Sequence, residues 1–442
     1  MRKEFIKIAV CSVILMMSHV SLSAQSGIED TWHGILEVPG GSLTLVLHIS
    51  QEKCTIDSPD QMAYGIPAEA KELSQVRADI YVPSLDAGFE GNLTFGLLVG
   101  KFKQAGMEFP LTLKRGEPVR NRPQTPKPPF PYVTKECTFT NTNDGAVLSG
   151  TLTYPENHSD KTPVVLFVSG SGLQDRNEEI FAHKPFMVIA DRLARNGIAS
   201  LRYDDRSVGK STGDASNATT ATFMADAEAG LEYLRGLDRF GKVGIAGHSE
   251  GGTIAFILAG EGKADFIVSL AGAAVSGAAI LQEQNEIMLE KGGIPSDIAK
   301  AYGKALDKLY GNIRMSAEEL ANVSYGLPEA LRSNLRSVRE SLGTNAWLRY
   351  FLALDPSEQI TKIKCPVMAV NGDKDVQVIA GTNMTAIGRL LSQSDHNLIK
   401  TYPGLNHMFQ PCGTGMPDEY GRIEITVSEE VLNDIAGWIN NL

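Results

Sequence analysis

One pentapeptide in the chain has the residue types and the spacing of an activated serine. Gly247-His248-Ser249-Glu250-Gly251 fits the pattern G-x-S-x-G, and it follows a short apolar segment and precedes one of small residues. In a tight strand-to-helix turn the flanking positions have no room for bulk, and the serine hydroxyl is held clear of the sheet. The pattern predicts that Ser249 is a nucleophile and that the Glu250 backbone N–H, at the helix start, stabilises an oxyanion.

A serine hydroxyl is a poor nucleophile without a base, so a histidine oriented by a carboxylate must lie nearby. In hydrolases built around such a turn, the acid and then the histidine follow the serine along the chain. Only His396 and His407 lie downstream. We expect a strand to hold His396, whereas His407 follows that strand in a Pro-Gly loop and is the predicted base. Asp375, three residues after a glycine, is the predicted acid, and Asp373 is the alternative because it can instead cap the turn.

A second oxyanion donor is expected in the glycine-rich loop that follows an apolar run at residues 163–169. This loop begins Ser169-Gly170-Ser171-Gly172, and its glycines give the backbone freedom to aim N–H groups at a substrate oxygen. We predict the Ser171 N–H as the donor, with Gly172 or Leu173 as alternatives. The loop can also be a plain glycine turn without a role in chemistry.

The elements that must position these groups alternate between strand and helix from residue 132 onward. This alternation predicts a mostly parallel sheet covered by helices on both faces, an α/β fold. The expected strands are residues 136–141, 147–154, 163–169, 198–203, 242–246, 265–271, 366–370 and 398–402. The expected helices are residues 184–196, 221–237, 251–259, 380–391 and 428–442. Between them, residues 276–352 show only helical patterning, over 278–290, 298–309, 317–321 and 329–342, which predicts a cap over the strand ends.

The N-terminal part of the chain has a different texture. Residues 1–24 combine a basic start, a short apolar run and a small-residue stretch, which is the layout of a cleaved signal peptide. Residues 27–115 read as a small antiparallel β domain, a sandwich or an open barrel, with strands at 31–38, 43–49, 78–82, 93–98 and 109–113 and one possible helix at 68–73. Residues 116–131 hold six prolines and predict a semi-rigid linker to a catalytic domain at 132–442.

Residues 132–442 resemble the α/β-hydrolase fold, in particular its secreted, esterase-like branch. The resemblance is carried by Ser-Gly-Ser-Gly-x-x-Asp-Arg at residues 169–176, Arg-x-Asp-x-Arg at 202–206 and the serine motif at 247–251. Residues 347–351, 355–356 and 372–378 also match, whereas Ser169 stands where many relatives carry histidine. The resemblance implies carboxylesterase-type activity. Residues 27–115 resemble an N-terminal β module of some secreted members, and the match implies no role for it.

Composition narrows the remaining possibilities. Hydrophobic residues make up 43% and charged residues 21% of 442, which is typical of a soluble globular protein. The formal net charge of −11 disfavours general binding of nucleic acid. Beyond the leader, Cys54, Cys137, Cys365 and Cys412 are widely spaced, so free thiols are favoured over disulfides. No metal or other cofactor is expected, because no cluster has metal-ligand spacing and the Gly-Lys-Ser segment at 209–211 lacks the first glycine of a phosphate-binding loop.

Together these features predict an exported serine hydrolase, periplasmic or secreted, that cleaves carboxylic esters through an acyl-enzyme. The expected substrate is a small-molecule or carbohydrate-linked ester, and no membrane span is expected after removal of the leader. Peptide or amide hydrolysis and acyl transfer remain open as alternative reactions on the same fold. A catalytically silent protein that binds glycan or envelope material is the alternative of another class.

Overall fold

The structure is a computed structural model that describes residues 27–38, 41–61 and 63–442. The leader expected at residues 1–24 lies outside the described residues. The chain divides into two compact units, Met1–Pro118 and Val119–Leu442, and the division falls inside the expected linker. Each unit is described by itself.

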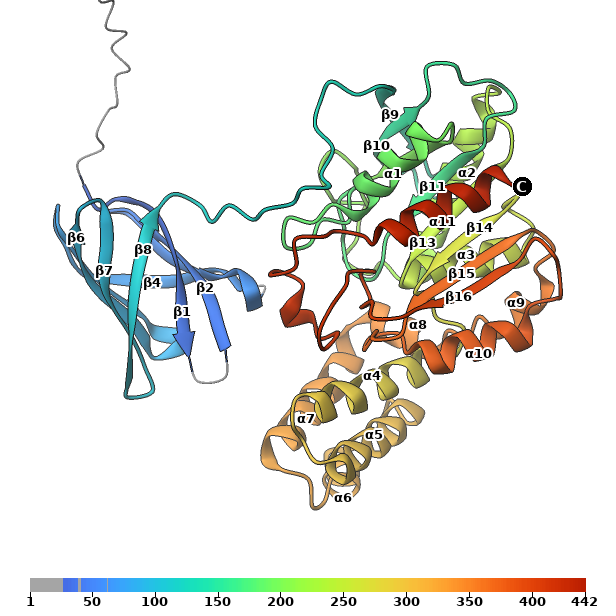
Figure 1. Cartoon of the computed structure of the whole chain (residues 1–442). Coiled ribbons are helices and arrows are strands. Elements are labelled where there is room, and N and C mark those ends of the chain that lie inside the picture. Colours follow the sequence, from blue (N-terminus) through green and yellow to red (C-terminus); the bar gives the residue numbers. More distant parts are fainter. Residues whose placement is uncertain (1–26, 39–40, 62) are drawn as a thin grey trace, which may run out of the picture. The chain divides into compact units, whose positions relative to one another are not determined.

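The first unit is a closed barrel of eight antiparallel strands, each paired with its neighbour in sequence (Figure 1). The strands are β1 (Asp30–Val38), β2 (Gly41–Ile49), β3 (Cys54–Ser58), β4 (Ala63–Leu73), β5 (Arg77–Val82), β6 (Ala87–Thr94), β7 (Leu97–Gln104) and β8 (Met107–Arg115). β1 also pairs with β8, where Trp32 lies opposite Arg115, and this pairing closes the barrel. Alternate side chains fill its interior, among them Trp32, Ile80, Phe89 and Leu113.

Two local expectations for this unit were wrong. Residues 68–73 are the end of β4 rather than a helix, because Ala68 pairs with β3 and residues 69–73 pair with β5. Residues 93–98 are not one strand but the tip of the β6–β7 hairpin, where Phe95 and Gly96 have positive φ angles of 49° and 79°.

The second unit is built on an eight-stranded sheet in the order β16-β15-β14-β13-β11-β12-β10-β9. Its strands are β9 (Val133–Thr140), β10 (Val147–Tyr154), β11 (Val164–Val168), β12 (Ala199–Tyr203), β13 (Val243–His248), β14 (Ile267–Leu270), β15 (Val367–Gly372) and β16 (Leu398–Tyr402). The pairings from β12 to β16 are parallel, and β10 runs antiparallel to both of its neighbours. Every residue of β11 and β13 is buried, as expected for central strands covered on both faces.

Helices cover both faces of this sheet (Figure 1). On one face α1 (Pro185–Arg195) and α11 (Glu429–Asn440) pack against Val165 and Phe167 of β11. On the other face α2 (Thr220–Gly236), α3 (Glu250–Gly260), α9 (Ser357–Lys362) and α10 (Ala380–Leu390) pack against a core that includes Leu166. Successive side chains of β11 therefore serve opposite layers. The carboxyl ends of the central strands lead into the loops that carry the site.

A helical insertion separates β14 from β15. It comprises α4 (Gly277–Lys291), α5 (Ser296–Gly311), α6 (Ala317–Val323), α7 (Glu329–Thr344) and α8 (Ala346–Ala353) (Figure 1). The insertion has a core of its own, in which Leu306, Leu309, Leu335 and Leu342 are almost fully buried. The sequence pattern indicated α4 to α7 but no separate helix at α8 or α9.

The proline-rich segment beyond residue 118 is anchored to the second unit rather than free. The buried guanidinium of Arg122 donates to the carbonyls of Phe181 at 2.8 Å, Gly421 at 2.9 Å and Ile423 at 3.0 Å. The Gln124 amide oxygen accepts from the Thr426 and Val427 N–H groups at 2.7 and 3.0 Å. Burial lowers the pKa of Arg122 to about 10, so the side chain stays charged at neutral pH.

Candidate active site

Ser249 occupies the sharp turn between β13 and α3. Its φ of 53° and ψ of −118° are unusual for a residue other than glycine, and such strain is often found at functional sites. A Cβ on Gly247 would lie 2.0 Å from the Gly251 carbonyl oxygen, and one on Gly251 would lie 2.1 Å from that of Val168. The glycines of the motif are therefore required by close backbone contact. Ser249 is partly exposed and lines a pocket.

The structure brings His407 and Asp375 together on loops that follow β16 and β15. His407 Nδ1 lies 2.7 Å from Asp375 Oδ2, and the two side chains are 4% and 0% exposed. The other carboxylate oxygen, Oδ1, accepts from the Gln377 and Val378 N–H groups at 2.7 and 3.0 Å. These two donors fix the orientation of the carboxylate, which in turn holds the imidazole. His407 lines the same pocket as Ser249.

The two alternative residues lie elsewhere. Asp373 Oδ1 accepts from the Gly404 N–H at 2.6 Å, which is the turn-capping contact that the sequence allowed. His396 is exposed on the loop before β16, where its carbonyl accepts from the Trp438 indole at 3.0 Å. It does not line the pocket that contains Ser249.

Two backbone N–H groups beside Ser249 are free to bind a substrate oxygen. Among the described residues, neither the Glu250 N–H nor the Ser171 N–H has a hydrogen-bond partner, and both residues line the pocket. The Gly170 N–H is occupied, because it donates to Glu178 Oε1 at 2.7 Å. Gly172 and Leu173 do not line the pocket, so of the three alternatives in this loop Ser171 is the one placed toward it.

The pocket has a volume of about 300 Å³, near the lower end for ligand sites. The helical insertion supplies apolar lining through α4 and α8, and the Trp347 and Phe351 rings of α8 stack at 5.1 Å. None of the described residues lining the pocket is lysine or arginine. The buried Glu250 carboxylate has the Trp347 indole N–H as its donor, 3.1 Å from each oxygen. Its negative charge therefore has no cationic partner in the pocket.

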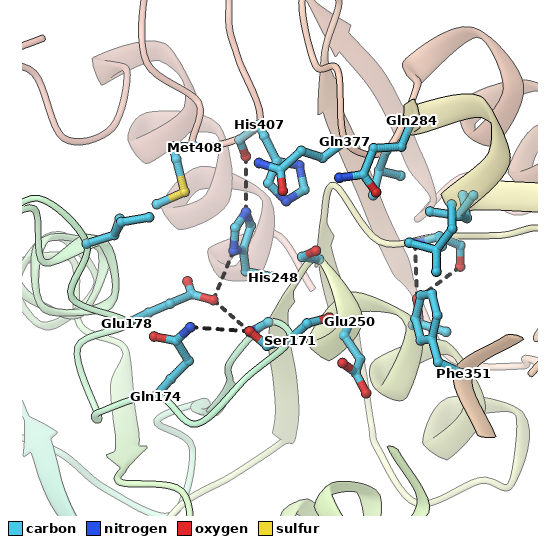
Figure 2. A pocket seen from close by; sticks show the side chains of 18 of the residues that line it. Ser171, Gln174, Glu178, His248, Glu250, Gln284, Phe351, Gln377, His407 and Met408 are labelled. Carbon is cyan, nitrogen blue, oxygen red and sulfur yellow. Dashed lines mark hydrogen bonds and ion pairs between the residues drawn. The ribbon is translucent and has the colours of Figure 1, made fainter. Parts of the chain in front are cut away.

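Sequence reasoning missed a buried pair of side chains in the lining of the pocket. His248 Nδ1 lies 3.0 Å from Glu178 Oε1, and His248 Nε2 lies 3.0 Å from the His407 carbonyl oxygen (Figure 2). Burial alone would lower the pKa of His248, but the Glu178 carboxylate, the His407 carbonyl and Asp375 together outweigh burial and raise it. Glu178 comes directly after the loop motif at 169–176, and nothing local marks it as the partner of a residue 70 positions away.

The charged segment after β12 stabilises the loops around the site. Asp204 pairs with Arg176 at 2.7 Å and Arg206 with Asp226 at 2.7 Å. Asp205 has no such cation and instead accepts from the Ser169 hydroxyl at 3.1 Å and the Gln174 N–H at 2.9 Å. Burial raises the pKa of Asp205 to about 7, although the hydrogen bonds from these two donors act to lower it.

The residues that the structure describes show neither a metal site nor a membrane span. No group of histidine, cysteine, aspartate and glutamate in that part of the chain is arranged to hold a metal ion. Nor does any helix there have the length and apolar character to cross a membrane. The four cysteines of the described ranges are free thiols, with Cys54 buried and Cys137, Cys365 and Cys412 partly buried.

Several known proteins are similar to this chain. Esterase EstD of Thermotoga maritima is 26% identical over 296 residues, and the match covers 66% of this chain and 65% of that protein, so the chain spans a little under two thirds of the relative's length. The ferulic acid complex of Est1E from Butyrivibrio proteoclasticus is 18% identical, covering 69% of this chain and 98% of that one, with a TM-score of 0.42. The Pyrococcus furiosus esterase Pf2001 is 16% identical, and the match covers 74% of this chain and 99% of that one, with a TM-score of 0.42. Neither structural likeness carries weight for the activity of this chain.

A family model assigns the chain. The model described as serine aminopeptidase, S33, matches residues 183–410, which is more than half of the sequence. The matched segment contains the strand-to-helix turn, the helical insertion and the Asp375–His407 pair. This match confirms the expected α/β-hydrolase fold. The chain belongs to the serine aminopeptidase S33 family of the α/β-hydrolases.

Proposed function

We propose that the chain is an exported serine hydrolase that cleaves carboxylic esters through an acyl-enzyme. The observation that carries the proposal is the pocket lined by both Ser249, on its strained turn, and His407, whose Nδ1 is 2.7 Å from a buried Asp375 oxygen. Export rests on the leader pattern at residues 1–24.

The proposed reaction follows from the atoms that each group presents. Ser249 Oγ attacks the acyl carbon, and His407 Nε2 takes the hydroxyl proton while Nδ1–H stays bonded to Asp375. The free N–H groups of Glu250 and Ser171 stabilise the oxyanion. His407 then gives its proton to the departing alcohol. Water, deprotonated by the same imidazole, attacks the acyl carbon and releases the acid and the free serine.

The helical insertion is proposed to act as the cap that shapes the pocket. Ile280, Leu281 and Gln284 of α4 and Trp347 and Phe351 of α8 line the pocket, so the insertion contributes four apolar side chains to its lining. A pocket of about 300 Å³ favours short acyl groups over long ones. A panel of p-nitrophenyl esters from acetate to palmitate tests this: kcat/KM should peak at short chains, and a maximum at long chains would contradict the cap assignment.

A serine variant tests the nucleophile. Ser249→Ala should lower kcat for p-nitrophenyl acetate on the order of 10⁴-fold or more and abolish labelling by a fluorophosphonate probe. Ser337→Ala, an exposed helix position on α7, is the matched control and should behave as the wild type. Equal turnover by the wild type and Ser249→Ala would refute the proposal. A wild-type chain that binds glycan but is not labelled would identify the silent binding protein instead.

Peptide hydrolysis is the second candidate, and the family model favours it, because its description names an aminopeptidase. Alanine p-nitroanilide and p-nitrophenyl acetate distinguish the two reactions on one preparation. The ester proposal expects a much higher kcat/KM for the acetate, and the reverse order would assign a peptidase. Products formed with competing alcohols separate hydrolysis from acyl transfer.

A further inference from the structure

Three segments of the site meet at the buried Glu178–His248 pair. Glu178 Oε1 accepts from the Gly170 N–H at 2.7 Å, next to the proposed oxyanion donor Ser171. The same oxygen lies 3.0 Å from His248 Nδ1, on the residue that precedes Ser249. His248 Nε2 in turn lies 3.0 Å from the carbonyl oxygen of His407. Figure 2 shows this chain of contacts running from the loop of Ser171 to His407.

The contacts determine the protonation of the pair. The His407 carbonyl can only accept, so His248 Nε2 carries a proton. The Gly170 N–H can only donate, so Glu178 Oε1 accepts from it. The short approach of Nδ1 to the same oxygen then requires a second proton between them. We assign this proton to His248, because the neighbouring carboxylates raise the pKa of its imidazole, so His248 is an imidazolium paired with a Glu178 carboxylate and the pair is neutral as a whole.

The charges around His248 agree with this assignment. Glu178 faces it from the loop before α1, Asp375 from the loop after β15, and the His407 ring from the loop after β16, with ring centroids 4.7 Å apart. The two carboxylates favour the protonated state of His248 and burial opposes it. The Glu178 carboxylate offsets part of the repulsion between the His248 imidazolium and the imidazolium that forms on His407, whose ring centroid is 4.7 Å away.

Stability alone does not account for the pair. Buried ion pairs often stabilise a fold no better than apolar residues of the same size. Here the second carboxylate oxygen, Glu178 Oε2, is buried without a hydrogen-bond partner among the described residues, which costs free energy. Glu178 also has a positive φ of 52°. Both unfavourable features occur at Glu178, a residue that lines the pocket.

We propose that Glu178 and His248 are positioning residues of the esterase site, an inference that rests on the proposed function. The pair holds the His407 backbone and the Gly170–Ser171 backbone at fixed places on either side of Ser249. It acts through these backbone groups and does not touch the substrate's reacting atoms. Its loss should therefore lower kcat more than it changes KM.

Glu178→Gln is the sharpest perturbation because it is isosteric and must still break one contact. If the amide oxygen replaces Oε1, a neutral His248 must donate from Nδ1, and its bare Nε2 then faces the His407 carbonyl. If the amide nitrogen replaces Oε1, it can donate to Nδ1 but opposes the Gly170 N–H. Only a charged His248 without a counterion would keep all the bonds, and burial disfavours that state.

The first measurement is the ¹⁵N spectrum of the His248 ring in the wild-type chain, which needs no variant. We expect both ring nitrogens to be protonated at pH 7, and in Glu178→Gln the pH at which the ring loses its second proton should fall by at least about one unit. Kinetics with p-nitrophenyl acetate follow on the same proteins. Glu178→Gln should lower kcat about 10- to 100-fold and change KM less than about threefold. Glu179→Gln, the exposed neighbouring position, is the matched control and should leave both readouts unchanged.

Each outcome has one meaning. A singly protonated His248 in the wild type at pH 7 overturns the assignment of the pair. Wild-type turnover that Glu178→Gln leaves unchanged overturns the positioning role alone. Wild-type turnover no greater than that of Ser249→Ala overturns the proposed function, and the positioning role with it. A lower kcat at nearly constant KM, together with the shifted ¹⁵N titration, supports the proposal.

Discussion

Replacing Asp375 by asparagine should trap His407 in the wrong tautomer. In the wild type, Asp375 Oδ1 accepts from two backbone N–H groups, those of Gln377 and Val378, while Oδ2 accepts from His407 Nδ1. The asparagine oxygen must stay on the two backbone donors, so its NH₂ group faces Nδ1. His407 then keeps its proton on Nε2 and cannot accept one from Ser249.

The size of the effect follows from the cost of turning the amide around. The flipped asparagine restores the bond to Nδ1–H but leaves two buried N–H groups facing an NH₂. Each unsatisfied group costs about 1–3 kcal/mol, or about 2–6 kcal/mol together. At about 1.4 kcal/mol per tenfold change, kcat should fall by a factor between about 30 and 10⁴.

The assay is steady-state hydrolysis of p-nitrophenyl acetate by the wild type, Asp375→Asn and Asp373→Asn. The last variant is the matched control, because Asp373 caps the turn through the Gly404 N–H and does not contact His407. It should stay within about threefold of the wild type in kcat, as expected for a surface substitution. Loss of activity in Asp373→Asn with full activity in Asp375→Asn would refute the assignment of the acid.

Three further predictions concern a buried acid, the charge of the pocket and the anchored linker. The pKa of Asp205 is raised from 3.8 to about 7, so the folded state binds the carboxyl proton more tightly than the unfolded chain does. The contribution of Asp205 to stability is therefore lost as pH rises from about 4 to 7. The melting temperature of Asp205→Asn relative to the wild type should therefore rise between pH 4.5 and 7.5, and a difference that does not vary with pH would contradict this. Glu250→Gln removes the carboxylate charge in the pocket while keeping an acceptor for the Trp347 indole. The kcat/KM for the anionic ester p-nitrophenyl hemisuccinate, divided by that for p-nitrophenyl acetate, should therefore rise roughly tenfold. An unchanged ratio would show that the carboxylate does not influence substrate choice. Arg122→Ala leaves the Phe181 and Ile423 carbonyls without their donor, while the Gly421 carbonyl keeps its bond from Arg120, and should lower the free energy of unfolding by about 3 kcal/mol in urea titrations. A loss below about 0.5 kcal/mol would show that the anchor contributes little.

The sequence was most informative where a local pattern determines the structure. The turn at Ser249 could be predicted because the G-x-S-x-G pattern itself is local, with Gly247 in close contact with Gly251 four residues later. The predominantly parallel sheet could be predicted because β11 is a continuous apolar run. The contact between Asp375 and His407 spans 32 positions, yet each residue follows its own strand of a parallel sheet, so the shared edge brings them together.

The errors arose where distant partners override local preference. Residues 68–73 have helix-forming composition, but pairing of residues 69–73 with β5 makes them part of β4. The apolar residues on either side of Phe95 read as one strand because the turn between them contains a single glycine. Glu178 gave no signal, since its role depends on a residue in another strand. The prolines predicted a spacer, and nothing in their pattern shows that Arg122 binds carbonyls about 300 positions away.

The anchor at Arg122 recognises main-chain atoms and not side chains. Its three acceptors outside its own segment are carbonyl oxygens, from Phe181, Gly421 and Ile423. Amino-acid exchanges at those three positions would leave the acceptors in place, whereas an insertion or deletion nearby would move them. Over evolutionary time this attachment should tolerate drift in residue identity and resist change in loop length.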